Sequence, residues 1–341
     1  MKKILLGFFI TSSFLFAGEL ANEEDFMKMC NNPTPSQKIT FEAIAKYKSI
    51  KHDKDMCAYL YARTGSKYFS ADADIYNVTD LSPLKFFVSL TSLSLPRSKV
   101  KDISILKHLT KLKELNLSDN PVSDLSALKD LKYLEELDLY NTQVKDLSPI
   151  NNINALQQLS YGYIKNIDTI DISQIKDLTN LEFLVLGGIK VKNFHMINNF
   201  KNLIVFLPPK TTTMQDMNSL TNLKKLERLS LRNNKFITNV DFILNFPNMQ
   251  ELFINNTRIK DISVLKKLSK LTILNISGTQ VTDASGVMAD TDRDPKYLTF
   301  TASNTPLRWC SPKNTQDIRD RKSCFEKDGT LKTFWKRWLG L

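Results

Sequence analysis

The sequence has few of the residues and motifs that catalysis requires. Of its 341 residues only three are histidine, at His52, His108 and His195. It contains no recognisable pairing of a nucleophile with a base, no metal-ligand spacing and no glycine-rich phosphate loop. We therefore predict that the protein is not an enzyme, binds no cofactor or metal, and has no small-molecule substrate.

Long hydrophobic runs are also scarce. The one apolar stretch near the start, residues 4–17, follows Lys2 and Lys3 and is interrupted by Thr11 to Ser13. It is too short to span a bilayer comfortably, and it is typical of a secretory signal peptide occupying residues 1–17. An uncleaved membrane anchor is the alternative. We predict an exported protein, either periplasmic or secreted, and export makes nucleic acid an improbable partner.

A period of 22 residues organises most of the chain. The segment 112–147 reads LKELNLSDNPVSDLSALKDLKYLEELDLYNTQVKDL, and Leu112, Leu115 and Leu117 return 22 residues later. A fixed period of this size indicates a solenoid. The first leucine of each unit has counterparts along the chain, at Leu90, Leu112, Leu134, Leu156, Leu181, Leu203, Leu226, Met249 and Leu271. A polar residue follows in each unit, at Asp80, Asp102, Asp124, Asp146, Asp171, Asn193, Asp216, Asn239, Asp261 and Asp283.

Each unit has the chemistry of a strand, a turn and a short helical segment. The L-x-L alternation places leucines on one face of a strand and variable residues on the other. Polar side chains that can satisfy backbone groups inside a bend follow the strand, at Asn120, Thr142, Asn234, Thr257, Thr279 and Thr305. The Asp-Leu-Ser unit then resembles a cap for a short helical turn. Because one repeat cannot bury its own leucines, stacking must supply the core.

The pattern L-x-x-L-x-L-x-x-(N/T)-x-(V/I)-x-D-(I/L)-S-x-L resembles bacterial leucine-rich repeats, most closely the 22-residue kind of internalins. About ten repeats occupy residues 67–308. The resemblance implies an α/β fold, a curved solenoid with a parallel concave sheet and short convex helical turns. It also implies a function in binding other proteins.

The segments on either side of the repeats are expected to close the ends of the solenoid. Residues 18–66 predict a small helical cap, and residues 309–341 predict a second cap. The four cysteines, Cys30, Cys57, Cys310 and Cys324, all lie in these segments. Strands about 4.8 Å apart separate the two ends by roughly 45–50 Å, whereas a disulfide needs Cα atoms within about 7 Å. We therefore predict disulfides Cys30–Cys57 and Cys310–Cys324.

The last stretch, LKTFWKRWLGL, is basic and amphipathic. Its apolar residues fall on one helical face, at Leu331, Phe334, Trp335, Trp338 and Leu339. One reading is a cap helix that covers the last repeat. The other is a helix at residues 330–341 that contacts a membrane surface or lipopolysaccharide, as in a periplasmic or envelope-associated structural protein.

The outward strand positions form the predicted binding surface. Early repeats place polar and acidic residues there, and the middle repeats place apolar ones. An exposed apolar cluster marks an interaction site, and aromatic residues are favoured anchors. The predicted protein-binding residues are Phe183, Val185, Val205, Leu207, Tyr140, Phe253, Arg228 and Arg232. Pro208 and Pro209 leave an alternative open, in which the strand shifts its frame and turns Val205 or Leu207 inward.

The net charge of the chain is +11. Much of the excess is lysine in the segments predicted to be convex, which is typical of a solvated face. Together these features favour an exported protein-recognition module that binds a protein partner through its concave face. By resemblance to internalins, adhesion or virulence is the expected role. The absence of a cell-wall sorting motif after the repeats distinguishes the chain from that family.

Overall fold

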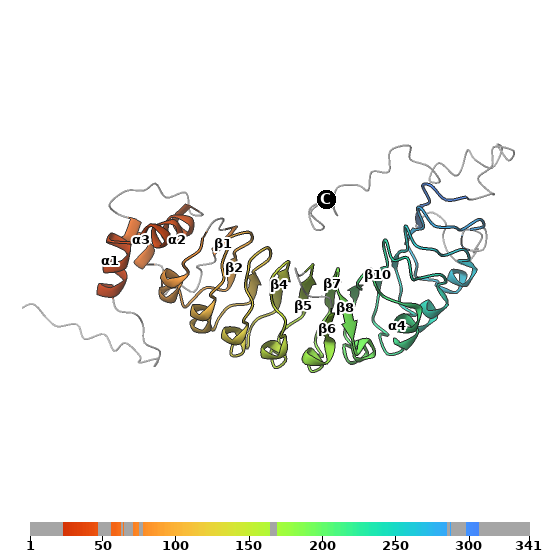
Figure 1. Cartoon of the computed structure of the whole chain (residues 1–341), viewed down its shortest axis with the longest axis horizontal. Coiled ribbons are helices and arrows are strands. Elements are labelled where there is room, and N and C mark those ends of the chain that lie inside the picture. The colour runs from red at the N-terminus through yellow and green to blue at the C-terminus, as the bar shows by residue number, and fades with distance from the viewer. Residues whose placement is uncertain are drawn as a thin grey trace, which may run out of the picture.

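The repeats stack into an arch. The computed structural model describes residues 23–46, 56–62, 64, 71–74, 78–163, 169–284, 287 and 298–306. Strands run along the inner side of the arch and short helical segments along its outer side (Figure 1). All the strands of the inner sheet pair in parallel, each with the strand of the following repeat. The leucine-rich-repeat solenoid predicted from the sequence is confirmed.

Eleven strands make up this concave sheet. Most contain three residues, and β4, β5 and β7 contain five. In spatial order they are β1 (Ala71–Asp74), β2 (Ser92–Ser94), β3 (Glu114–Asn116), β4 (Glu136–Tyr140), β5 (Gln158–Gly162), β7 (Phe183–Gly187), β9 (Val205–Leu207), β10 (Arg228–Ser230), β11 (Glu251–Phe253), β12 (Ile273–Asn275) and β13 (Thr299–Thr301). A separate pair, β6 (Thr169–Asp171) and β8 (Lys190–Lys192), forms a small second sheet.

The convex side carries short 3-10 helices, as the 22-residue period predicted. They are η1 (Ser82–Phe86), η2 (Ser104–His108), η3 (Ser126–Leu128), η4 (Ser148–Ile150), η5 (Ile172–Ile175), η6 (Phe194–Asn199), η7 (Asp241–Asn245) and η8 (Ser263–Lys267). One repeat differs, since an α-helix, α4 (Met214–Ser219), takes this place. Thr213 and Asp216 cap its N-terminus reciprocally, an arrangement that satisfies two backbone donors at once.

Side chains from the strand and the convex segment of each repeat meet in one continuous core. Leu115 of β3 and Leu117 just after it are buried, as are Leu106 and Leu109 from the convex side. In the Asp-Leu-Ser units the aspartate carboxylate accepts from the backbone nitrogen of the serine. Asp171 is the N-cap residue of η5, as predicted, whereas in η1, η2, η3, η4 and η8 the residue after the aspartate is the N-cap and makes no side-chain cap hydrogen bond. In the repeat that follows β3, Asp124 Oδ1 accepts from the backbone nitrogen of Ser126 at 2.8 Å. Ser82, Ser104, Ser148, Ser173 and Ser263 donate in the same way to the aspartate two residues before them.

Three helices precede the repeats: α1 (Glu23–Asn31), α2 (Pro35–Lys46) and α3 (Met56–Tyr61). The buried ring of Phe26 lies 5.7 Å from Phe41 and 5.0 Å from Phe86, so α1 is anchored to both α2 and the first repeat. The predicted disulfide between Cys30 and Cys57 is present and joins α1 to α3. The predicted signal peptide, the Cys310–Cys324 pair and the C-terminal cap with residues 330–341 lie outside the described residues. Within the described parts, no helix is long and apolar enough to cross a membrane.

Candidate functional site

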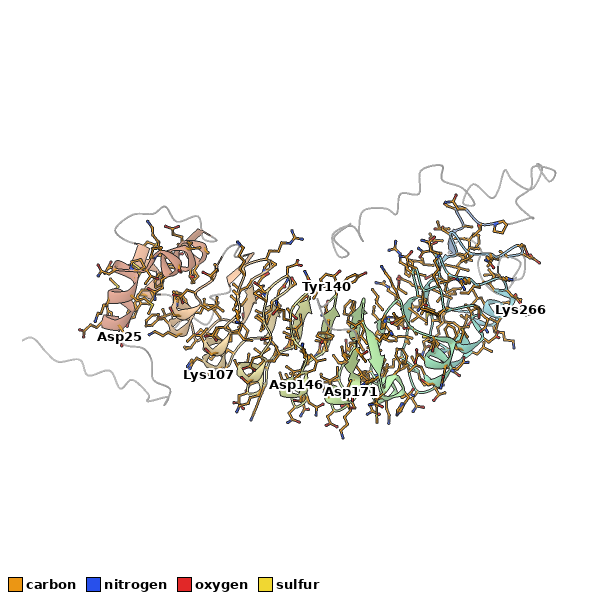
Figure 2. All side chains as sticks on the ribbon, viewed as in Figure 1. Asp25, Lys107, Tyr140, Asp146, Asp171 and Lys266 are labelled. Carbon is orange, nitrogen blue, oxygen red and sulfur yellow. A yellow bond between two sulfur atoms is a disulfide. The ribbon has the colours of Figure 1, made fainter. Side chains whose placement is uncertain are left out.

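Outward-facing side chains form two continuous rows along the concave sheet. The first row contains Ser92, Glu114, Glu136, Gln158, Phe183, Val205, Arg228, Glu251 and Ile273 in consecutive register. The second runs through Ser94, Asn116, Asp138, Ser160, Val185 and Leu207. Tyr140, at the end of β4, lies on the inner side of the arch, while Lys107 and Lys266 lie along its outer side (Figure 2).

A groove of about 770 Å³ follows these rows from β2 to β9. It is open to solvent along the inner side of the arch. Four of the predicted binding residues line it, namely Tyr140, Phe183, Val185 and Leu207. The other four, Val205, Arg228, Arg232 and Phe253, are not among the residues that line this groove. Half of the predicted binding residues therefore line the groove, and the other half lie beside it or on the repeats that follow it.

The apolar part of the groove keeps the strand alternation intact. Phe183 and Val185 on β7, and Val205 and Leu207 on β9, are all half-buried. Phe206 between the last two is completely buried. The alternative in which the prolines turn Val205 or Leu207 inward is therefore wrong. Strand β9 ends at Leu207, before both prolines.

The part of the groove over β3 and β4 is acidic. Ser92 Oγ donates to Glu114 Oε2 at 2.9 Å, and Gln158 Nε2 donates to Glu136 Oε1 at 2.5 Å. Burial, together with the neighbouring charges of Glu114 and Glu135, raises the pKa of Glu136. Burial also raises the pKa of Asp138, although a backbone hydrogen bond from Tyr140 opposes the shift. The groove thus concentrates carboxylates. No lysine or arginine lines it, although Arg97 beside it pairs with Asp119 at 3.2 Å.

Beyond the groove, the predicted cationic residue Arg228 is already engaged. Its Nη2 lies 2.5 Å from Glu251 Oε1, and both side chains are largely shielded from solvent. A cation held this way is unsuited to pair with a carboxylate of a partner. Arg232 is exposed, and Phe253 is half-buried. Strand β10 lies between β9 and β11, and its residue Ser230 pairs in register with Phe253. Phe253 is thus separated from the apolar residues of β9 by a serine.

An exposed tyrosine at the edge of the groove escaped the sequence-based site prediction. The ring of Tyr163 lies 5.1 Å from the ring of Tyr140, and Lys210 Nζ lies 5.7 Å from the centre of the Tyr163 ring. Tyr163 is 43% exposed and has a φ of 53°. A Cβ on Gly187 would lie 2.8 Å from the Tyr163 ring, so the absence of a side chain there makes room for it. The sequence did contain a signal for this contact, because residues 161–163 read Tyr-Gly-Tyr and residues 187–188, one repeat later, read Gly-Gly.

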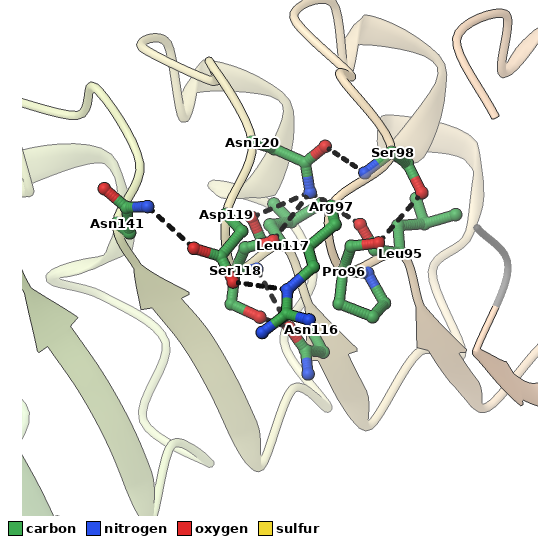
Figure 3. A network of polar contacts seen from close by, with 10 residues as sticks. All are labelled: Leu95, Pro96, Arg97, Ser98, Asn116, Leu117, Ser118, Asp119, Asn120 and Asn141. Atoms are coloured by element: carbon green, nitrogen blue, oxygen red, sulfur yellow. Dashed lines mark hydrogen bonds and ion pairs between the residues drawn. The ribbon is translucent and has the colours of Figure 1, made fainter. Parts of the chain in front are cut away.

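A ladder of polar side chains fixes the turns at the edge of the groove (Figure 3). Asn120 Nδ2 donates to the carbonyls of Leu95 and Leu117, at 2.5 and 3.0 Å, and so joins two repeats. Outside it, Asp119 accepts from Arg97 Nε at 3.2 Å and from Asn141 Nδ2 at 2.7 Å. These bonds hold the turns after β2, β3 and β4 in a fixed order, which preorganises the acidic part of the groove.

Among the described residues, no group of three or more His, Cys, Asp or Glu is placed to hold a metal ion. Neither histidine nor cysteine lines the groove. The groove lining consists of carboxylate, amide, hydroxyl and apolar side chains that present a continuous surface along the strands.

A family model described as "Leucine Rich repeats (2 copies)" matches residues 88–130, 110–152 and 247–287. No match is found among curated proteins. An internalin of Listeria monocytogenes is 24% identical with a TM-score of 0.63, over 82% of this chain and 80% of that one. A leucine-rich-repeat protein of Leptospira interrogans is 19% identical with a TM-score of 0.54, over 71% and 73%.

A third similar structure comes from a plant. The leucine-rich-repeat ectodomain of the Arabidopsis receptor kinase HAESA, in complex with a peptide hormone, is 19% identical with a TM-score of 0.52. The match covers 67% of this chain and 42% of the receptor chain. These similarities agree with the repeat register and the concave sheet described above. The chain therefore has the fold of a leucine-rich-repeat solenoid, and its residues 88–152 and 247–287 match the repeat model.

Proposed function

We propose that this protein is an exported recognition module that binds a partner protein in its concave groove. The observation that carries the proposal is the row of half-buried apolar side chains on β7 and β9. Phe183, Val185 and Leu207 point away from a core that their neighbours Leu184, Leu186 and Phe206 already fill. When a partner covers apolar groups on a concave surface, their removal from water stabilises the complex.

Export is supported by two features of the chain. The apolar run at residues 4–17 has the composition of a signal peptide. The disulfide between Cys30 and Cys57 suits an oxidising compartment. The resemblance of the repeats to those of internalins implies an adhesion or virulence role, and the chain is similar to an internalin of Listeria. The HAESA ectodomain, a solenoid of this fold, is in complex with a peptide hormone.

We infer that the groove serves binding rather than catalysis. Its lining contains carboxylates, amides, serines and apolar groups, and it contains neither histidine nor cysteine. The curved sheet is rigid, since every strand from β2 to β12 in it is bonded to two neighbours and stacked on a continuous leucine core. A rigid preformed surface lowers the entropic cost of association.

A comparative capture experiment tests the proposal. Full-length protein would be immobilised beside a groove variant, Val185→Asp with Leu207→Asp, and a control variant, Tyr133→Asp with Leu244→Asp. The control residues are 64% and 43% exposed and do not line the groove. All three would be exposed to envelope extracts of the producing cells and to host-cell membrane extracts, after circular dichroism confirms folding.

The expected result is a protein retained by the wild type and the control and lost by the groove variant. The extract that supplies it identifies the compartment in which the protein acts. If the groove variant retains the same proteins as the wild type, the concave groove is not the binding site.

A further inference from the structure

The groove divides into two chemically different halves along the arch. Over β3 and β4 its walls carry Glu114, Asp119, Glu136 and Asp138. Over β7 and β9 they carry Phe183, Val185 and Leu207. Between them, β5 presents the neutral residues Gln158 and Ser160. The acidic and apolar halves are thus neighbours within one continuous groove.

The charge of the acidic half is opposite to that of the protein as a whole. The chain has a net charge of +11, yet none of the outward residues on strands β2 to β7 is lysine or arginine. Exposed lysines such as Lys107, Lys129 and Lys132 lie in the convex segments instead. Carboxylates that are partly removed from water gain the most from a cation that replaces the lost solvation. Asp119 already pairs with Arg97, so Glu114, Glu136 and Asp138 are the carboxylates available to a partner cation. Burial raises the pKa of Glu136 and Asp138, as expected for carboxyls partly removed from water.

We infer that the groove binds an extended segment of a partner protein that carries a lysine or arginine in register with an aliphatic or aromatic residue. The inference rests on the proposed function and specifies the chemistry of its ligand. The cation would lie between the carboxylates of β3 and β4 and against the ring of Tyr140, which can add a cation–π contact. The apolar residue would cover Val185 and Leu207.

The spacing of these two residues follows from the sheet. The centre of the acidic half lies between β3 and β4, and the centre of the apolar half lies between β7 and β9, three strand spacings farther on. Three spacings of about 4.8 Å give roughly 14 Å. An extended chain advances about 3.3 Å per residue, so the basic and apolar residues are about four positions apart. Residues four apart in an extended segment point to the same side, as insertion into one groove requires.

Selection of peptides on the intact protein tests the inference. A phage library of random twelve-residue peptides would be selected on the immobilised full chain. Enriched clones would then be measured on three variants. One removes groove acids (Glu114→Gln with Glu136→Gln), one alters the apolar half (Val185→Asp with Leu207→Asp), and one removes two carboxylates that do not line the groove (Asp130→Asn with Glu182→Gln).

The expected result is a set of peptides with lysine or arginine about four positions from an aliphatic or aromatic residue. Their binding should fall at least tenfold on each groove variant and stay within twofold on the off-groove control. Enrichment of acidic peptides whose binding is lost on the Val185→Asp, Leu207→Asp variant would overturn the inference while leaving the concave site in place. Peptides that bind all variants equally, or no enrichment over the bare support, would overturn the inference and count against the concave site as well.

Discussion

Asn120 and Ser98 are joined across two repeats: Asn120 Oδ1 accepts a hydrogen bond from the backbone nitrogen of Ser98 at 3.0 Å. The same oxygen accepts from the backbone nitrogen of Val100 at 2.9 Å. The Asn120 side chain is almost completely buried, so water cannot replace these bonds. One amide therefore satisfies the backbone of a turn that belongs to the neighbouring repeat.

Replacement of Asn120 by alanine should lower the free energy of unfolding by about 3 kcal/mol, because several buried backbone groups lose their partner. Asn120→Thr should lose about half as much, since a threonine hydroxyl at this position can bond within its own repeat. Thr142 does this in the next repeat, where its Oγ1 donates to the carbonyl of Leu139 at 2.8 Å. Urea unfolding of the two variants would measure the difference. Equal stability of Asn120→Ala and the wild type would contradict the role of the ladder.

Gly162 and Gly187 make a second matched pair. Gly162 has a φ of 150°, and a Cβ on it would lie 2.3 Å from the backbone nitrogen and oxygen of Gly187. Gly162→Ala should therefore destabilise the protein by several kcal/mol, of the order of 3. The Cβ of Gly187→Ala would instead lie too close to the Tyr163 ring, which can move, and at an ordinary contact distance of 3.7 Å from Tyr140, so the substitution should cost about 1 kcal/mol.

Thermal unfolding of both glycine variants and of Gly187→Ala with Tyr163→Ala would check this. The double variant should recover most of the loss caused by Gly187→Ala. Absence of any recovery would show that Tyr163 does not occupy the space above Gly187.

Features of the fold that each repeat encodes within its own residues could be predicted from the sequence. The alternation around Leu115 and the turn position of Asn120 each recur in many repeats. The strands, the turns after them and the short helical segments on the convex side could therefore be predicted from the period. The pairing of Cys30 with Cys57 followed as well, because the length of the solenoid separates the two ends. Helix α4 did not, although its capping pair, Thr213 and Asp216, lies in a repeat whose departure from the pattern at Pro208 and Pro209 was visible in the sequence.

The groove was less predictable than the strands. Its apolar side chains could be assigned from the alternation, but two contacts between repeats could not. Arg228 was expected to be available to a partner, and the structure pairs it with Glu251 one repeat later. Tyr163 follows an irregular repeat, and its place beside Tyr140 depends on the space left by Gly187. Both contacts join residues of different repeats, so the sequence of one repeat alone does not predict them.

The acidic half of the groove should make stability depend on pH. Burial raises the pKa of Asp138 above its ordinary value of 3.8, so the folded state holds this proton at a pH where the unfolded chain has released it. The contribution of Asp138 to stability is then fully present below pH 3.8 and is lost as the pH rises through the folded pKa. Asp138→Asn should therefore be more stable than the wild type at pH 7, by up to about 1 kcal/mol, and equal to it near pH 3.

Asp102 provides a control of opposite sign. Hydrogen bonds from Ser104 lower the pKa of Asp102, so its contribution to stability is present at neutral pH and is lost as the pH falls through the folded pKa. Asp102→Asn should thus be less stable than the wild type at pH 7 and equal to it in acid. Unfolding curves at pH 3, 5 and 7 would measure both variants. A less stable Asp138→Asn at pH 7 would contradict the electrostatic account of the groove.

The disulfide should hold the N-terminal helices on the first repeat. Cys30 and Cys57 are 27 residues apart in sequence, and a loop of that length corresponds to about 3–4 kcal/mol of unfolded-state entropy. Cys30→Ser with Cys57→Ser should therefore unfold at lower temperature and expose α1 and α3 to protease before the repeats are cut. If protease cut α1 and the central repeats at the same time, the disulfide would not have this local role.

Arg228 and Glu251 should show the asymmetry of a shielded ion pair. Glu251→Gln should destabilise the protein by about 2 kcal/mol because it leaves a partly buried cation without its partner, whereas Arg228→Met with Glu251→Leu should be nearly neutral. Chemical unfolding of the single and double variants would measure this coupling. If the double variant loses as much stability as the single one, the pair contributes in a way that apolar packing cannot replace.

The central claim is that the concave groove contacts a partner. Site-specific photo-crosslinking tests it most directly, with benzoylphenylalanine placed at Ser160 on β5 in the groove, or at the exposed convex residue Lys129. In envelope and host-membrane extracts, the account predicts a discrete protein adduct from position 160 that is absent from position 129. Adducts only from position 129, the same adducts from both positions, or none from position 160 would contradict it.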